Sequence, residues 1–166
     1  MAEASSPRSP EDKVLGRTEL VRRFGRPRGQ RLVFTNGCFD LLHRGHASYL
    51  HAARRLGDVL VVGVNTDASV RRLGKGPGRP LMGEADRAFL LASLECVDAV
   101  TLFDEDTPLE LIVQLGPDVL VKGGDYRPDT VVGRETVEGA GGMTVILPYA
   151  AGYSTTALLK RAKEVP

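Results

Sequence analysis

The clearest pattern along the chain is a series of five short apolar runs separated by longer, mixed stretches. The second run, Val-Leu-Val-Val-Gly-Val, contains no polar side chain. Continuous apolar runs without polar alternation are typical of parallel strands that are covered on both faces. We therefore predict strands at residues 32–34, 59–64, 99–103, 119–121 and 144–147.

The stretches between these runs have apolar residues at helical spacing. After Gly45 they fall at positions 49, 50, 53 and 56, and further helices are predicted near residues 14–24, 66–70, 84–94, 135–138 and 154–163. Asp106 or Thr107 is expected to cap another helix, with Pro108 in its first turn. This alternation predicts an α/β fold: a single Rossmann-like domain with a five-stranded parallel sheet flanked by helices and right-handed crossovers. Ligands of such domains bind outside the carboxyl ends of the strands.

Three regions are expected along the chain. Residues 1–12 are rich in Ser, Pro and charge and have no apolar core, which predicts a disordered leader and neither a signal peptide nor a membrane span. Residues 13–30 are expected to form an N-terminal helix and a linker. Residues 31–166 form the α/β domain itself.

Composition narrows the classes of partner. A net charge of +1 with 26% charged residues argues against bulk attraction to nucleic acid or to a membrane surface, so any anion must be bound locally. Cys38 and Cys96 are too few for a disulfide framework, and no Cys-x-x-Cys spacing suggests a metal site. A reducing cytoplasm is the expected location.

Two histidines lie where the first predicted strand gives way to a helix. Gly37 ends the apolar run, and His43 and His46 follow three residues apart, a spacing that keeps both side chains on one helix face. The free amides of a helix N-terminus attract anions, so the two imidazoles and these amides would converge on one phosphate-sized spot. Gly45 lacks the side chain that would obstruct a ligand's approach to the backbone. The loops at residues 122–126 and 152–156 are expected at the same rim of the sheet.

These residues carry a resemblance to a known family. Gly37-Cys38-Phe39-Asp40 and His43-Arg44-Gly45-His46 resemble the signature of the nucleotidyltransferase superfamily that includes glycerol-3-phosphate cytidylyltransferase and phosphopantetheine adenylyltransferase. Within it, the chain is similar over about residues 30–162 to the adenylyltransferases for D-glycero-D-manno-heptose 1-phosphate. The stretches that carry this similarity are residues 35–43, 64–70, 78–80, 103–108, 121–126 and 152–156.

The resemblance implies transfer of AMP from ATP to heptose 1-phosphate, which gives ADP-heptose and pyrophosphate. Mg²⁺ is expected with the triphosphate, held by phosphates and water and not by a protein cage. Relatives often join this domain to a sugar kinase, which is missing here, so the chain is expected to be the free-standing form. A homo-oligomer is expected, and no nucleic acid or membrane partner.

The resemblance also assigns roles to residues. Catalysis is assigned to His43, His46 and Lys75. Nucleotide binding is assigned to Thr35, Asn36, Gly37, Cys38, Phe39, Gly45, His46, Gly124, Asp125, Tyr126, Ser154, Thr155 and Thr156. Binding of the acceptor sugar phosphate is assigned to Asp40, Asn65, Lys75, Arg87 and Lys122. A purely turn-stabilising role suits Asp40 and Asn65 equally well.

This reaction needs no general base, because a phosphate monoester has a second pKa of about 6 and its oxygen is already ionised at neutral pH. Accordingly, the sequence shows no nucleophile-elbow motif. Two alternatives remain open. One is a CTP-dependent cytidylyltransferase acting on glycerol 3-phosphate or a similar small phosphate, and the other is a nucleotide-sensing module without turnover.

Overall fold

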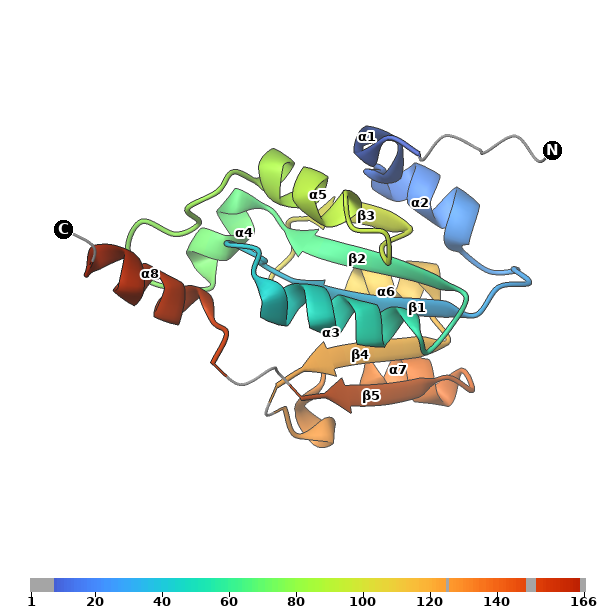
Figure 1. Cartoon of the computed structure of the whole chain (residues 1–166). Helices are drawn as coiled ribbons and strands as arrows, with labels where there is room; N and C mark the ends of the chain where they lie inside the picture. Colours follow the sequence, from blue (N-terminus) through green and yellow to red (C-terminus); the bar gives the residue numbers. More distant parts are fainter. Residues whose placement is uncertain (1–7, 125, 149–151, 165–166) are drawn as a thin grey trace.

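A five-stranded parallel sheet forms the centre of the molecule, with helices on both faces (Figure 1). The computed structural model describes residues 8–124, 126–148 and 152–164. The strands are β1 Leu32–Gly37, β2 Val59–Asn65, β3 Ala99–Phe103, β4 Val119–Gly123 and β5 Met143–Leu147. They lie in the order β3-β2-β1-β4-β5 and every neighbouring pair is parallel. The predicted α/β fold and its strands are confirmed.

The helices occupy the stretches where helical spacing was found. In chain order they are α1 Pro10–Lys13, α2 Arg17–Phe24, α3 Arg44–Arg54, α4 Asp67–Arg72, α5 Glu84–Ala92, α6 Leu109–Leu115, α7 Arg134–Gly139 and α8 Thr155–Lys163, with a 3₁₀ helix at Pro128–Thr130. Side chains cap several of them, as in α4, where the Thr66 hydroxyl accepts a hydrogen bond from the Ser69 amide. Within the described residues, no helix combines the length and apolar character that crossing a bilayer requires.

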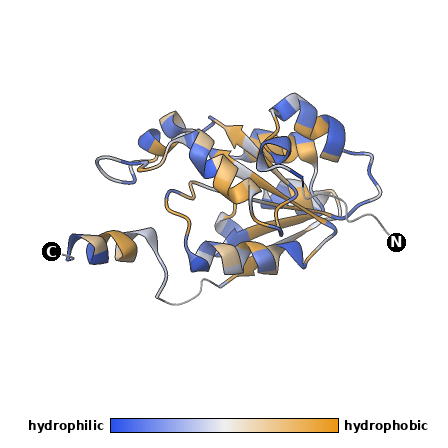
Figure 2. Cartoon of the chain, turned by 45° about the horizontal axis from the view of Figure 1, so that its top comes forward, coloured by the Kyte–Doolittle hydropathy of each residue, from blue (hydrophilic) through white to orange (hydrophobic). Residues whose placement is uncertain are grey.

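Each face of the sheet has its own hydrophobic core. Tyr49 and Leu50 of α3 and Leu91 of α5 pack with Val62 on one face. On the other face, α2, α6 and α7 pack against the alternate strand residues, with Leu20 and Ile112 fully buried. Figure 2 shows the result, with hydrophobic colouring along the central strands and hydrophilic colouring on the outer helix surfaces. Because β2 is buried along its whole length, its sequence can be apolar from Val59 to Val64.

The segment before β1 packs on the sheet edge formed by β3. Val14 forms a parallel bridge with Val100, and the Leu15 amide donates to the Val100 carbonyl over 2.8 Å. Pro10–Lys13 is helical, so order begins within the stretch that was predicted as a disordered leader, whose first seven residues lie outside the described part. This packing covers a sheet edge that would otherwise present unpaired backbone groups.

One predicted helix start is wrong. Helix α6 begins at Leu109 with Pro108 as its N-cap residue, and neither Asp106 nor Thr107 caps it. The Asp106 carboxylate instead accepts a hydrogen bond from Arg72 Nε at 2.9 Å. A tertiary ion pair has replaced the local cap.

Candidate active site

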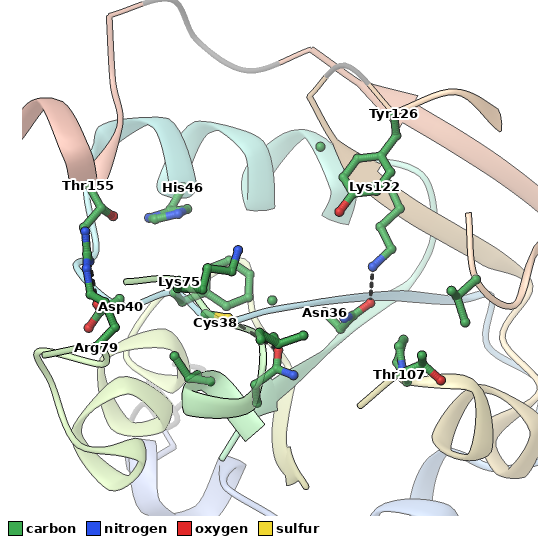
Figure 3. Close-up of a pocket in the computed structure, with 18 of the residues that line it drawn as sticks. Asn36, Cys38, Asp40, His46, Lys75, Arg79, Thr107, Lys122, Tyr126 and Thr155 are labelled. Atoms are coloured by element: carbon green, nitrogen blue, oxygen red, sulfur yellow. Dashed lines mark hydrogen bonds and ion pairs between the residues drawn. The ribbon is translucent and has the colours of Figure 1, made fainter. Parts of the chain in front are cut away.

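The carboxyl ends of the strands open onto a cavity of about 520 Å³. It lies where β1 sits between β2 and β4, the point at which the strand order reverses and where α/β sheets bind ligands. Figure 3 shows His46 and Thr155 on one side of this cavity, and Asn36, Lys122 and Thr107 on the other. Of the residues assigned from sequence, the cavity is lined by Asn36, Gly37, Cys38, Phe39, Asp40, His46, Asn65, Lys75, Lys122, Tyr126, Thr155 and Thr156.

The two histidines stack on each other at the start of α3. Their ring centroids are 3.8 Å apart and the planes are inclined by 19°. His43 is the N-cap residue, and its Nδ1 accepts a long hydrogen bond of 3.4 Å from the His46 amide. Because Nδ1 is the acceptor, the proton of the neutral ring is on Nε2, which is left as a donor. The sequence spacing thus places both imidazoles together, as predicted.

Both rings are held in the neutral form. Burial, followed by the neighbouring His43, lowers the pKa of His46 to about 4, and burial also lowers the pKa of His43. At neutral pH the pair therefore offers N–H donors without a full positive charge. Helices α3 and α8 have no acidic side chain in their first turns, which leaves those amides without local anionic competitors.

Gly45 makes room for its neighbours. A Cβ built on it would lie 2.9 Å from His43 Cε1 and 3.0 Å from Tyr153 Cβ. The missing side chain therefore makes room both for the histidine ring and for the segment that leads into α8.

On the other side of His46, the Phe39 ring packs edge-on with the centroids of the two rings 5.2 Å apart, and Phe39 adopts a left-handed φ of 48°. Such strain in a non-glycine residue is often found at functional sites.

Lys122 is the most deeply buried cation of the cavity. It is 9% exposed, its Nζ donates to Asn36 Oδ1, and it lies 6.0 Å from the centre of the Tyr126 ring. Burial lowers the pKa of Lys122 to about 8, so most of the population is protonated at neutral pH. The Asn36 oxygen is neutral and no carboxylate of a described residue pairs with Lys122, so its charge is available to an anion.

A second cation, Lys75, lines the cavity from the exposed loop between α4 and α5. The far end of this loop is anchored by Asp40, whose carboxylate pairs with Arg79 at 2.6 Å and accepts the amides of Leu81 and Met82. Burial alone would raise the pKa of Asp40, but Arg79 and these amides hold it below its ordinary value. Both carboxylate oxygens are therefore already bonded, and this arrangement favours the turn-stabilising reading of Asp40.

Arg87 does not line the cavity, although it was expected to bind the acceptor phosphate. Its side chain is fully buried, and its guanidinium donates to Met82 O at 3.0 Å, Cys38 O at 2.6 Å and Asp67 Oδ1 at 2.8 Å. All three nitrogens are thus bonded within the protein. Arg87 joins α5 to the turn after β1 and to α4, and so supports the cavity from behind.

Thr35 also lies away from the cavity. It is fully buried, and its hydroxyl is 2.7 Å from that of Tyr49, which donates in turn to Val121 O. Strand alternation directs Thr35 beneath α3, so it fixes that helix and has no surface to offer a nucleotide. His43, Gly45, Gly124 and Ser154 adjoin lining residues without lining the cavity themselves. The remaining prediction, Asp125, lies outside the described residues.

Asn65 lines the cavity with its amide already engaged. Its Nδ2 donates to Ser69 Oγ at 3.0 Å, and its Oδ1 lies 3.8 Å from the Cys38 sulfur.

Burial raises the pKa of the Cys38 thiol, so this thiol is protonated at neutral pH and is no candidate nucleophile. Next to the lining residue Thr155, the Ser154 hydroxyl caps α8 by accepting from the Ala157 amide at 3.0 Å. No group of three or more His, Cys, Asp or Glu side chains able to hold a metal ion occurs among residues 8–124, 126–148 and 152–164.

Comparison with known sequences decides the family. The sequence model of the cytidylyltransferase-like family matches residues 34–161, which include the histidine turn and the start of α8. The chain belongs to the cytidylyltransferase-like family. Every element from β1 to the last helix therefore falls within, or overlaps, the family's domain.

Two relatives of this cytidylyltransferase-like chain carry a more specific name. It is 57% identical over 155 residues to D-beta-D-heptose 1-phosphate adenylyltransferase of Bordetella bronchiseptica. The match covers 93% of this chain and 96% of that protein. It is 58% identical over 139 residues to bifunctional protein HldE of Trichlorobacter lovleyi, covering 84% of this chain. The match spans only 28% of the length of HldE.

Solved structures similar to this chain include a lipopolysaccharide core biosynthesis protein from Thermoplasma volcanium. It is 31% identical, with a TM-score of 0.61, and the match covers 74% of this chain and 98% of that one. Pantoate-beta-alanine ligase from Francisella tularensis has a TM-score of 0.59 at 13% identity, over 90% of this chain and 76% of that one. The latter likeness concerns the fold alone.

Sequence reasoning missed part of the cavity wall in this cytidylyltransferase-like domain. The missed lining residues are Tyr49, Val70, Leu73, Arg79, Asp106, Thr107, Pro108, Gly123, Thr130 and Val132. A signal existed for Asp106, Thr107 and Pro108, because they lie three to five residues after the end of a predicted parallel strand and therefore near the same edge as the histidine turn. Thr130 and Val132 follow no strand directly, and nothing in their local sequence marks them.

Proposed function

We propose that the chain transfers AMP from ATP to D-glycero-β-D-manno-heptose 1-phosphate, giving ADP-heptose and pyrophosphate. The β anomer is proposed from the name of the Bordetella relative, which is 57% identical over nearly the whole chain. The observation that carries the proposal is the stacked, uncharged histidine pair at the start of α3, of which His46 lines a cavity that the start of α8 also lines. Two helix N-termini and two imidazoles there suit a polyphosphate.

The proposed chemistry is a single in-line displacement. An ionised oxygen of the acceptor phosphate forms a bond to the α-phosphorus of ATP. The bond from that phosphorus to the bridging oxygen breaks, and pyrophosphate leaves with the electron pair. Since the acceptor oxygen carries no proton at neutral pH, no base is required. Inversion at the α-phosphorus is the expected stereochemistry.

The proposed work of the residues is positioning and electrostatic stabilisation. His43 and His46 donate N–H bonds to the triphosphate and to the charge that grows on the bridging oxygen. Lys75 and Lys122 neutralise the two phosphate-bearing substrates from opposite walls. Positioning can lower a barrier by about 7–11 kcal/mol and one aimed donor by about 3 kcal/mol. Together these effects suffice without covalent catalysis.

For the nucleotide, we propose that Gly124, Asp125 and Tyr126 lie against the base and ribose. The hydroxyl groups of Thr155 and Thr156, which line the cavity, and the amides at the start of α8 are proposed to bind phosphate oxygens. Mg²⁺ is proposed to enter with the triphosphate and to supply neutralisation of its charge. Its ligands would be phosphates and water.

Pyrophosphate release tests the proposal. Purified protein would be assayed with ATP, CTP, GTP and UTP, each against both anomers of heptose 1-phosphate and against glycerol 3-phosphate. We expect the highest kcat/KM for ATP with the β-heptose phosphate. Faster turnover of CTP with glycerol 3-phosphate would overturn the proposal. ATP binding without release of pyrophosphate with any acceptor would indicate a nucleotide-sensing module without turnover.

We further propose a cytoplasmic homo-oligomer. Val113 and Leu109 are 57% and 42% exposed on the outer surface of α6, one helical turn apart, and would be covered in an assembly. Both cysteines are free thiols, which suits a reducing compartment. Light scattering on the purified chain would measure the assembly, and a monomeric mass at micromolar concentration would contradict it.

A further inference from the structure

The segment after β3 has no role in the proposed chemistry, yet three of its residues reach the cavity. Asp106, Thr107 and Pro108 form part of the wall between the end of β3 and the start of α6. In Figure 3, Thr107 lies across the cavity from His46 and Thr155, on the side of Asn36 and Lys122. Whatever touches this wall is therefore a different part of the substrates from the part that touches the histidines.

The two sides of the cavity belong to the two faces of the sheet. His46 is on α3, which covers one face. Strand alternation puts Asn36 and Lys122 on the other face, with Phe34 and Leu120, which pack against α6. Lys122 stands near the strand ends, and the segment after β3 continues the wall beyond it. A phosphate held at Lys122 would leave the rest of its molecule next to this segment.

Polar groups without partners are present there. Within the described part of the chain, the Thr107 hydroxyl makes no hydrogen bond. Asp106 uses Oδ1 for its 2.9 Å contact with Arg72, and no described residue bonds to its Oδ2. The pair offers oxygen acceptors and one hydroxyl donor, while Pro108 and Val132 give the same wall apolar surface.

Charge decides what this wall accepts. Two of the described residues that line the cavity carry a carboxylate. That of Asp40 is fully engaged by Arg79 and the loop amides, so Asp106 presents the available one. A carboxylate repels phosphate and accepts hydrogen bonds from hydroxyl groups. A neutral carbon chain with several hydroxyl groups satisfies both the oxygens and the apolar surface, whereas a phosphate does not.

We propose that Asp106 and Thr107 bind hydroxyl groups of the acceptor's sugar and thereby select a polyhydroxylated acceptor over a short one. The inference rests on the proposed adenylyl transfer to a sugar phosphate. Arg72 acts as a positioning residue, because its contact holds Oδ1 of Asp106 and leaves Oδ2 for a hydroxyl group. Discrimination of this kind arises because a site built for hydrogen bonds disfavours a ligand that cannot make them.

Thr107→Val and Asp106→Leu test the inference, since each keeps a side chain of similar size and removes the groups that can hydrogen bond to a hydroxyl. KM and kcat would be measured for ATP and for heptose 1-phosphate, and kcat/KM for glycerol phosphate as a short acceptor. We expect KM for heptose 1-phosphate to rise about tenfold in each variant, the effect of one lost hydrogen bond, with KM for ATP unchanged. Activity with the short acceptor should not fall, so the ratio between the acceptors should shrink about tenfold.

Thr136→Val is the matched control, because Thr136 is exposed on α7 away from the cavity. Unchanged acceptor KM in both cavity variants would overturn the inference, and so would an equal rise in the KM of ATP and of acceptor, which indicates general disturbance. Wild-type protein that turns over no sugar phosphate would instead overturn the proposed function and the inference with it. The wild-type assay therefore separates the two failures.

Discussion

At the scale of single residues, the uncharged histidine pair is expected to contribute more to turnover than to ATP affinity. A neutral imidazole gains most from a partner whose negative charge increases during the reaction, which is the bridging oxygen. We therefore predict that His46→Ala lowers kcat by a hundredfold or more, on the order of one removed transition-state donor, with little change in ATP affinity. Pyrophosphate release and equilibrium ATP titration measure the two effects.

His51→Ala is the control for this substitution, because His51 is exposed on the same helix. Its turnover should equal that of the wild type. A His46 variant with full turnover would remove the proposed mechanism, and a variant that only loses ATP affinity would make His46 a ground-state ligand.

The pH dependence of kcat/KM should separate three groups. The acid limb is expected near pH 6, from the acceptor phosphate itself, since the pKa of His46 is about 4 and the ring stays neutral well below that limb. The alkaline limb is expected near pH 8, where buried Lys122 loses its proton and with it the attraction for phosphate. Lys122→Arg should shift the alkaline limb to higher pH, because a guanidinium does not titrate there. An alkaline limb unmoved in this variant would exclude Lys122 as its source.

The residue scale is also where sequence reasoning succeeded unevenly. His46, Lys75 and Lys122 line the cavity, because motif spacing and strand ends carry that information. Thr35 belongs to the same motif but points under α3, and only the partner hydroxyl of Tyr49, fourteen residues later, reveals this. Arg87 was misplaced for a similar reason, because its acceptors are scattered along the chain at Cys38, Asp67 and Met82.

At the scale of elements, Arg87 joins α5, α4 and the turn after β1 into one support. Arg87 is fully buried, and its removal leaves the partly buried Asp67 carboxylate and two carbonyl oxygens without this donor. We predict that Arg87→Met lowers the free energy of unfolding by about 3 kcal/mol, measured by urea denaturation. Arg71→Met is the control, since Arg71 is exposed on α4, and it should change stability by less than about 0.5 kcal/mol. Unchanged stability with a raised acceptor KM would restore the phosphate-binding role.

The boundaries of elements show where local signals end. Strand positions were predictable, because fully buried parallel strands such as β2 are written as unbroken apolar runs. The start of α6 was not, because Asp106 is a good capping residue by type and is drawn instead to Arg72, 34 residues away. The order of the strands likewise depends on long-range packing that periodicity does not encode.

At the scale of the whole molecule, the segment before β1 is part of the folded unit. Leu20 is fully buried against the same core as α6, and its loss would leave a cavity. We predict that Leu20→Ala lowers the free energy of unfolding by about 3 kcal/mol, within one cooperative transition. Leu90→Ala, on the exposed side of α5, should have little effect. A separate early transition, with the main one unchanged, would mean that residues 8–24 fold independently of the sheet.

The uncharged rings of His43 and His46 determine how the activity of the protein responds to salt. With a net charge of +1, the molecule exerts little long-range pull on a triphosphate, and local lysines must provide the attraction. Ions shorten the reach of such charges to about 8 Å at physiological ionic strength. Adding potassium chloride should therefore raise KM for both substrates while maximal velocity stays nearly constant, because dipoles and not ions act on the breaking bond.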